Sequence, residues 1–142
     1  MVLKQISVTL PNRPGELSKL SDILGDEGIN VRAVAAATEA ESSVVRFVVD
    51  NPRKALAVFQ SRGYEVVTHD VFAVETPDHP GGLNAVLKPL KEAGINVLFL
   101  YPFIGRFHDN AVIIIGVDRT EDAIAVLQKN YIPVLQKELY SI

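Results

Sequence analysis

The sequence contains no cysteine among its 142 residues. Without cysteine the chain can form no disulfide, no cysteine-ligated zinc site or iron–sulfur cluster, and no thiol nucleophile. It also lacks any apolar run near the roughly 20 residues that a membrane-spanning helix needs, and its N-terminus shows no signal-peptide pattern. We therefore expect a cytoplasmic protein that does not enter a membrane.

Positive charge is scarce as well. The chain has 14 Lys and Arg against 17 Asp and Glu, a formal net charge of −3, and its basic residues are scattered. A nucleic-acid binder needs a basic footprint that displaces counterions. An RNA-binding sheet would also carry stacking aromatics on its first and third strands, where the first copy described below has only Phe47. We expect no nucleic-acid partner.

Motifs of catalysis and metal binding are missing too. There is no G-x-S-x-G, no Walker A run and no G-x-G-x-x-G. The three histidines, His69, His79 and His108, have no paired ligand spacing, whereas a metal site needs three or four convergent ligands. We expect no catalytic residue, no metal and no cofactor. A small enzyme stays as an alternative, because an acid–base pair such as Asp70 and Glu75 needs no motif.

What the sequence does contain is an internal repeat. The stretch LPNRPGEL at residues 10–17 returns as TPDHPGGL at 76–83, and GINV at 28–31 returns at 94–97, both at an offset of 66. Asp50 matches Asp118 at an offset of 68, so the second copy has gained two residues. Two copies describe a duplicated small domain, with the modules at residues 1–69 and 70–142.

Each copy alternates between the periods of a strand and of a helix. Residues 4–10 alternate like a half-buried strand, and Leu17, Leu20 and Leu24 form a helical stripe that ends at Gly28. Strands over 31–38 and 44–49, a helix between Asn51 and Gly63, and a strand from 65 complete the order βαββαβ. This order predicts an α+β fold of the ferredoxin-like kind, an antiparallel sheet with both helices on one face.

The second copy repeats this order from residue 71. Asp118 and Glu121 are spaced like a capping box for its second helix, and Asn130 stands where Gly63 stops the matching helix. No Gly/Ser/Pro-rich linker separates the copies. We therefore expect the two modules to pack side by side.

The loop after the first strand of each copy has the parts of a small anion site. A helix N-terminus offers unpaired N–H groups and a positive dipole end, and Gly15 or Gly81 lets the backbone approach a ligand. Asn12 and Asp78 add a short polar side chain that could bind a ligand. The alternative is that these are ordinary turn and capping residues.

With [ND]-x-P-G-x-L after strand one and G-I-N-V before strand two, twice, the chain resembles the ACT domain family. The resemblance covers nearly the whole chain and implies a regulatory protein that binds a small amino acid at the interface of paired modules and performs no catalysis. Family members regulate metabolic enzymes, so it implies a metabolic enzyme, or the protein's own assembly, as the target. The alternative is a small ferredoxin-like enzyme or a structural partner subunit without an amino-acid ligand.

The resemblance also implies two ligand sites. In each, loop N–H groups take the ligand carboxylate, and Asn or Asp side chains take its ammonium group. Because Gly82 replaces Glu16 and Asp78 replaces Asn12, we expect the second-loop site to be more open and to bind more tightly. One site uses Asn12, Arg13, Gly15 and Leu17 with Asn96; the other uses Asp78, His79, Gly81, Gly82 and Leu83 with Asn30.

Copy two differs from copy one in its continuous apolar strands. Residues 71–74, 97–100 and 111–115 are apolar in succession, which is typical of burial on both faces. We expect a second chain to cover the helix-free face, giving a homodimer built around copy two. Tyr101, Phe103 and Phe107 in the same copy either close over a ligand or partner, or pack beneath their own loop.

Overall fold

The computed structural model describes residues 3–77, 79–104 and 110–140, and the chain divides into two compact modules. The first module is Lys4–His69, and the second runs from Asp70 onward and includes Leu3. The division falls inside one long strand, β4, which spans Glu65–Thr76. The end of the first repeat and the start of the second are therefore one continuous strand with no linker between them.

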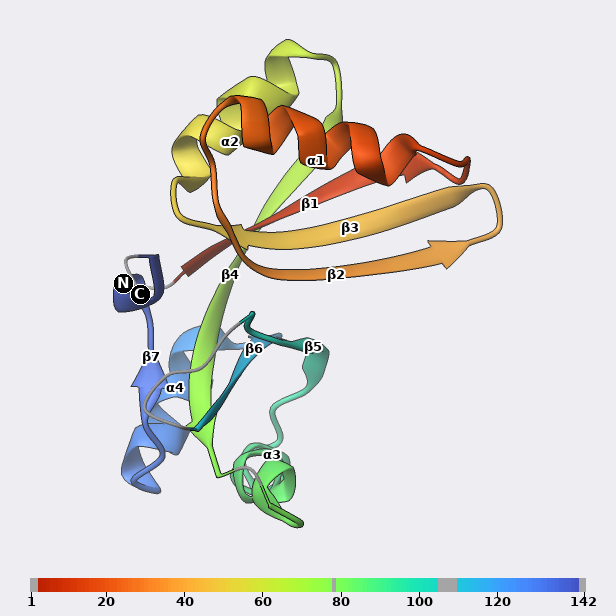
Figure 1. The fold of residues 1–142 in the computed structure, drawn as a ribbon. Coiled ribbons are helices and arrows are strands. Elements are labelled where there is room, and N and C mark those ends of the chain that lie inside the picture. Colours follow the sequence, from red (N-terminus) through yellow and green to blue (C-terminus); the bar gives the residue numbers. More distant parts are fainter. Residues whose placement is uncertain (1–2, 78, 105–109, 141–142) are drawn as a thin grey trace. The chain divides into compact units, whose positions relative to one another are not determined.

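The first module is a βαββαβ unit (Figure 1). Its sheet has the order β2-β3-β1-β4, and β3 is antiparallel to both β1 and β2. Residues 65–69 of β4 provide its last strand. The other elements are β1 (Leu3–Pro11), α1 (Glu16–Asp26), β2 (Val31–Glu39), β3 (Ser42–Val49) and α2 (Pro52–Ser61).

The core of the first module lies between this sheet and its two helices. Figure 1 shows α1 and α2 on the same side of β1, β2 and β3. The alternating residues of β1 predicted to face inward are buried against residues of both helices, and the cluster includes Ile6, Val8, Leu10, Leu20 and Phe59. The alternation of a half-buried strand predicts that the opposite face of β1 is exposed, but Gln5 on that face is fully buried.

The second module repeats this arrangement. Residues 70–76 of β4 provide its first strand, and the sheet order is β7-β4-β6-β5, in which β4 is antiparallel to β7 and β6, and β6 to β5. The helices α3 and α4 share one core with β4 and β6, so they cover one face. The elements are α3 (Gly82–Glu92), β5 (Val97–Pro102), β6 (Ala111–Val117), α4 (Thr120–Lys129), β7 (Val134–Leu135) and the 3-10 helix η1 (Lys137–Tyr140).

The predicted α+β class and the ferredoxin-like order of each module are thus confirmed. The prediction that Gly28 and Gly63 end the two helices of copy one is also confirmed, since both are left-handed, with φ of 68° and 81°. In copy two the corresponding left-handed residue is Tyr131, with φ of 61°, and not Asn130. The N–H groups of Asn130 and Arg62 make equivalent bonds at the ends of α4 and α2, which sets the offset at 68 and moves the stop to Tyr131.

The predicted capping box at α4 is wrong. The N-cap residue is Arg119, whose side chain makes no capping bond. The Asp118 carboxylate instead accepts a hydrogen bond from the N–H of Asn96 at 3.1 Å, just as Asp50 does from Asn30 at 3.0 Å. In both modules this aspartate fixes the segment that leads into the second strand.

The expectation of burial on both faces holds for β4 and only in part for β5. Residues 71–74 of β4 are all fully buried within the single chain, so that strand needs no second chain to cover it. On β5, Leu98 and Leu100 are 57% and 37% exposed. Tyr101 and Phe103 are buried, which favours packing within the chain over a closing lid; Phe107 and His108 lie outside the described residues.

Across the parts of the chain that the structure describes, every helix is too short or too polar to cross a membrane.

Candidate functional site

The loop before α1 and the loop before α3 lead into their helices with the same backbone conformation at the N-cap. The N-cap residues Gly15 and Gly81 have φ of 85° and 86°, and neither helix start carries a side-chain cap. The N–H of Glu16 donates to the Arg13 carbonyl and that of Gly82 donates to the His79 carbonyl. The capping alternative for Asn12 is therefore wrong. The loop instead presents a bare helix N-terminus, the positive end of the helix dipole.

Asn12 holds this loop against the β2–β3 turn. Its backbone N–H donates to the Glu41 carbonyl at 2.9 Å, and its side-chain Nδ2 donates to the Ala40 carbonyl at 3.0 Å. Because Nδ2 is engaged with a carbonyl, the amide orientation is determined and Oδ1 points elsewhere as an acceptor. An exposed amide oxygen beside a bare helix N-terminus can receive an ammonium group while the helix receives a carboxylate.

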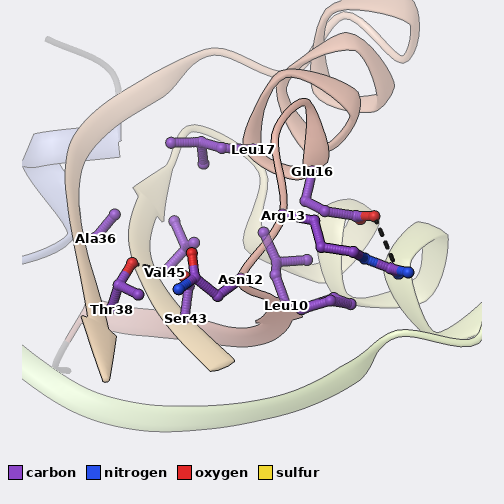
Figure 2. Close-up of a pocket in the computed structure, with 10 residues that line it drawn as sticks. Leu10, Asn12, Arg13, Glu16, Leu17, Ala36, Thr38, Ser43 and Val45 are labelled. Carbon is purple, nitrogen blue, oxygen red and sulfur yellow. Dashed lines mark hydrogen bonds and ion pairs between the residues drawn. The ribbon is translucent and has the colours of Figure 1, made fainter. Parts of the chain in front are cut away.

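A hollow of about 180 Å³ opens beside Asn12 (Figure 2). Leu17 forms part of its wall although its side chain is 47% exposed. Three of the predicted first-loop residues, Asn12, Arg13 and Leu17, thus meet at one hollow, while Gly15 supplies the turn that brings them there. The full lining is Leu10, Pro11, Asn12, Arg13, Glu16, Leu17, Ala36, Thr38, Ser43 and Val45.

The far wall of this hollow comes from residues that carry no sequence motif. Thr38 and Ser43 face each other across the β2–β3 hairpin, and their hydroxyl oxygens are 2.8 Å apart. Ala40 and Glu41 alone form the turn, with Ala40 at φ 55°. The signal that could have located this pair is the hairpin register, since a two-residue turn fixes which residues are opposite.

The second loop is less open than its sequence suggested. Gly82 is buried, and a Cβ built on it would collide with the backbone oxygen of Pro77. The packing of the loop therefore requires glycine at this position. The Pro77 carbonyl oxygen occupies the space that a side chain would need. The ring of His79 lies 2.8 Å from the Pro80 carbonyl through Nδ1, and Leu83 is 44% exposed. Asp78 lies outside the described residues.

Asn30 and Asn96 occupy matching exposed positions at the start of β2 and β5. Their backbone groups are fixed by Asp50 and Asp118, since each pair also exchanges a second bond from the Asp N–H to the Asn carbonyl. Their side chains extend from a rigid segment. Their assignment to a ligand site stays a prediction.

The described residues bring no metal centre together, because no group of three or more His, Asp or Glu side chains within ranges 3–77, 79–104 and 110–140 could hold an ion.

Comparison with known proteins gives two kinds of match. A family model described as an ACT domain pair matches residues 1–142. The structure is similar to a crystal structure of a Bacteroides thetaiotaomicron protein, at a TM-score of 0.92 and 29% identity, covering 100% of this chain and 98% of that one. No curated protein sequence matches the chain.

The fold also matches two proteins described as regulatory subunits of aspartate kinase. That of Thermus thermophilus gives a TM-score of 0.67 at 17% identity, and that of Thermus flavus a TM-score of 0.62 at 16% identity. Each match covers 92% of this chain and 94% of the other.

Proposed function

The chain belongs to the ACT domain family, and from its ACT domain pair we propose that it is a regulatory protein that binds a small amino acid and catalyses no reaction. The observation that carries this proposal is the hollow beside the bare N-terminus of α1 in the first module. Its volume of about 180 Å³ is below the roughly 300–1,000 Å³ of pockets for drug-sized ligands. A hollow of this size suits a single amino acid.

The lining suggests how the ligand lies. We place its carboxylate against the N–H groups at the start of α1, where the dipole favours negative charge. Its ammonium group then donates a hydrogen bond to Asn12 Oδ1, and the Thr38 and Ser43 hydroxyls lie on the opposite wall. Leu10, Leu17 and Val45 supply apolar surface for an aliphatic side chain. Arg13 also lines this hollow, with its side chain paired to Glu16 at 3.4 Å.

The equivalent site at the second loop is part of the same proposal. Gly81 has the same left-handed conformation as Gly15, and Leu83 is about as exposed as Leu17. Tighter binding at this loop stays a prediction that now depends on Asp78, because the Pro77 carbonyl oxygen occupies the place that a side chain at Gly82 would take. The second site would use Asp78, His79, Gly81, Gly82 and Leu83, and the assignment of Asn30 to this site and of Asn96 to the first stays a prediction.

We also propose that the protein works as a homodimer. The reason is the exposed apolar surface of β5, where Leu98 and Leu100 lie on the edge strand of the second module's sheet. An unpaired edge strand with large apolar side chains is a template for pairing with another chain. A second copy of this chain would cover it.

The target of regulation is proposed by analogy only. Regulatory subunits of aspartate kinase share this fold, and on that likeness we propose that ligand binding acts on a metabolic enzyme or on the assembly of the chain itself. The cytoplasmic location stays a prediction.

A thermal-shift panel of the common amino acids tests the binding function. A ligand at about 100 times its dissociation constant adds about 2.7 kcal/mol of stability, a rise on the order of 5–10 °C for a chain of this size. We expect one amino acid, or a few related ones, to give such a rise. A panel in which none does would favour the small enzyme or structural subunit instead. The variant Leu17→Glu should remove the response, while Val67→Glu, a change at another exposed residue of the same module, should keep it.

A further inference from the structure

A second and larger hollow lies on the first module, beside the end of α2. Its volume is about 560 Å³, and it is distinct from the hollow beside Asn12 although the two share Pro11, Arg13 and Glu16. In Figure 2 the Arg13 side chain points away from Asn12, Thr38 and Ser43 and toward Glu16. The lining comes from three segments of the module: Pro11, Arg13, Glu16, Lys19, Ile23, Arg62, Gly63 and Tyr64.

The charge of this hollow is opposite to that of the protein. Three cations line it, Arg13, Lys19 and Arg62, against the single carboxylate of Glu16, although the whole chain has a net charge of −3. Glu16 is paired with Arg13 at 3.4 Å. In the described part of the chain, the side chains of Lys19 and Arg62 form neither a hydrogen bond nor an ion pair. Two positive charges therefore face the hollow without a counterion from the protein.

The floor of the hollow is rigid and apolar. Ile23 is buried in the core of the module, and the half-buried Tyr64 ring packs edge-on against Phe59, with ring centroids 5.8 Å apart. Charged groups at the rim of an apolar floor attract an anion more strongly than charges surrounded by water.

The duplicated module shows that the fold does not require these cations. When Gly15 is aligned with Gly81, Arg13 corresponds to His79 and Lys19 corresponds to Ala85. When the ends of α2 and α4 are aligned, Arg62 corresponds to Asn130. None of the three positions keeps a Lys or Arg, so the same backbone folds without them. The cluster of Arg13, Lys19 and Arg62 therefore has no counterpart at the matching positions of the second module.

From this contrast we infer that the hollow is a second ligand site, which binds a small anion carrying two or more negative charges. Phosphate esters and polycarboxylates share that chemistry. Arg13, Lys19 and Arg62 act as its positively charged contacts, and the guanidinium groups offer paired N–H donors that suit phosphate and carboxylate oxygens. The site needs no amino acid in the neighbouring hollow, so its test is independent of the proposed function.

The test titrates the whole protein with inorganic phosphate, pyrophosphate and citrate, by calorimetry and amide NMR, at constant ionic strength. Lys19→Ala with Arg62→Asn installs the residues that the second module has at these positions, so the fold should tolerate the double variant. The control is Lys88→Ala with Lys129→Ala, the same change in charge on exposed residues of the second module.

We expect saturable binding of at least one probe, with amide shifts centred on residues 13–19 and 62–64. The double variant should bind about tenfold more weakly, whereas the control should bind like the unaltered protein. Equal loss in both double variants would overturn the inference, because it would show a response to net charge alone. Absence of saturable binding by all three probes would also overturn it.

Discussion

Gly82 and Gly25 are both helical glycines, but their surroundings differ. A Cβ on Gly82 would collide with the Pro77 carbonyl oxygen and lie 3.1 Å from Thr76 Oγ1, whereas a Cβ on Gly25 would meet no atom within 4 Å. The first position therefore needs glycine because of a close backbone approach. Glycine at position 25 has no such steric reason, so it only adds the conformational cost of glycine to the helix.

These surroundings predict opposite effects of the same substitution. Gly82→Ala should destabilise the protein by about 2 kcal/mol, as overpacking commonly does. Gly25→Ala should stabilise it by about 0.5 kcal/mol, since alanine is the better helix former. Urea denaturation measures both. A Gly82→Ala protein as stable as the original would show that the loop can relax away from the helix, contrary to the packing described here.

Helix ends are the elements in which the two modules differ most clearly. The end of α2 has Gly63 in the left-handed conformation, but the end of α4 has Tyr131 there, with a side chain that is 94% exposed. The left-handed conformation costs a non-glycine residue roughly 1–2 kcal/mol. Tyr131 gains no packing in return, because its ring lies almost wholly in solvent.

Replacing Tyr131 with glycine should therefore stabilise the second module. We expect Tyr131→Gly to raise the free energy of unfolding by about 0.5–1 kcal/mol, the relief of strain less the added entropy of glycine in the unfolded chain. Tyr131→Ala is the control, since it removes the ring but keeps the strain, and it should change stability little. Thermal unfolding of the three proteins distinguishes them. If Tyr131→Gly is the least stable of the three, the ring contributes to the fold in a way that its exposure does not show.

The elements themselves could be predicted from the sequence, because the alternation of residues 4–10 and the stripe of Leu20 and Leu24 directly reflect burial against a sheet or a helix. Details that depend on pairing between distant residues could not. The spacing of Asp118 to Glu121 predicts a cap, but the Asp118 carboxylate accepts a hydrogen bond from the N–H of Asn96 across the module. Likewise, Thr38 and Ser43 reach the first hollow only through the hairpin register.

The loop sites show the same limit. The repeated glycine motif correctly indicated a bare helix N-terminus, because Gly15 and Gly81 must adopt positive φ wherever they start the helix in this way. The motif carried no information on the volume beside it. The prediction of a more open second loop relied on the missing side chain of Gly82, and the Pro77 carbonyl that fills that space belongs to the same loop.

At the scale of the whole molecule, the exposed edge of β5 predicts the state of assembly. Changing both Leu98 and Leu100 to glutamate should convert a homodimer into a monomer, because it places charge on an apolar edge strand. Val67→Glu, at an exposed residue of the first module, should leave the dimer intact. Light scattering at micromolar concentration measures the mass of each. An unaltered protein that is already a monomer under these conditions would refute the dimer.

The central claim is that an amino acid binds in the hollow between the start of α1 and the β2–β3 hairpin. Amide chemical-shift mapping during titration with the amino acid that gives the largest thermal shift tests it most directly. We expect saturable shifts centred on residues 12–18 and 36–43, with little change in the same residues of the Leu17→Glu variant. Saturable shifts confined to other parts of the chain, or no saturable shift in the unaltered protein, would contradict it.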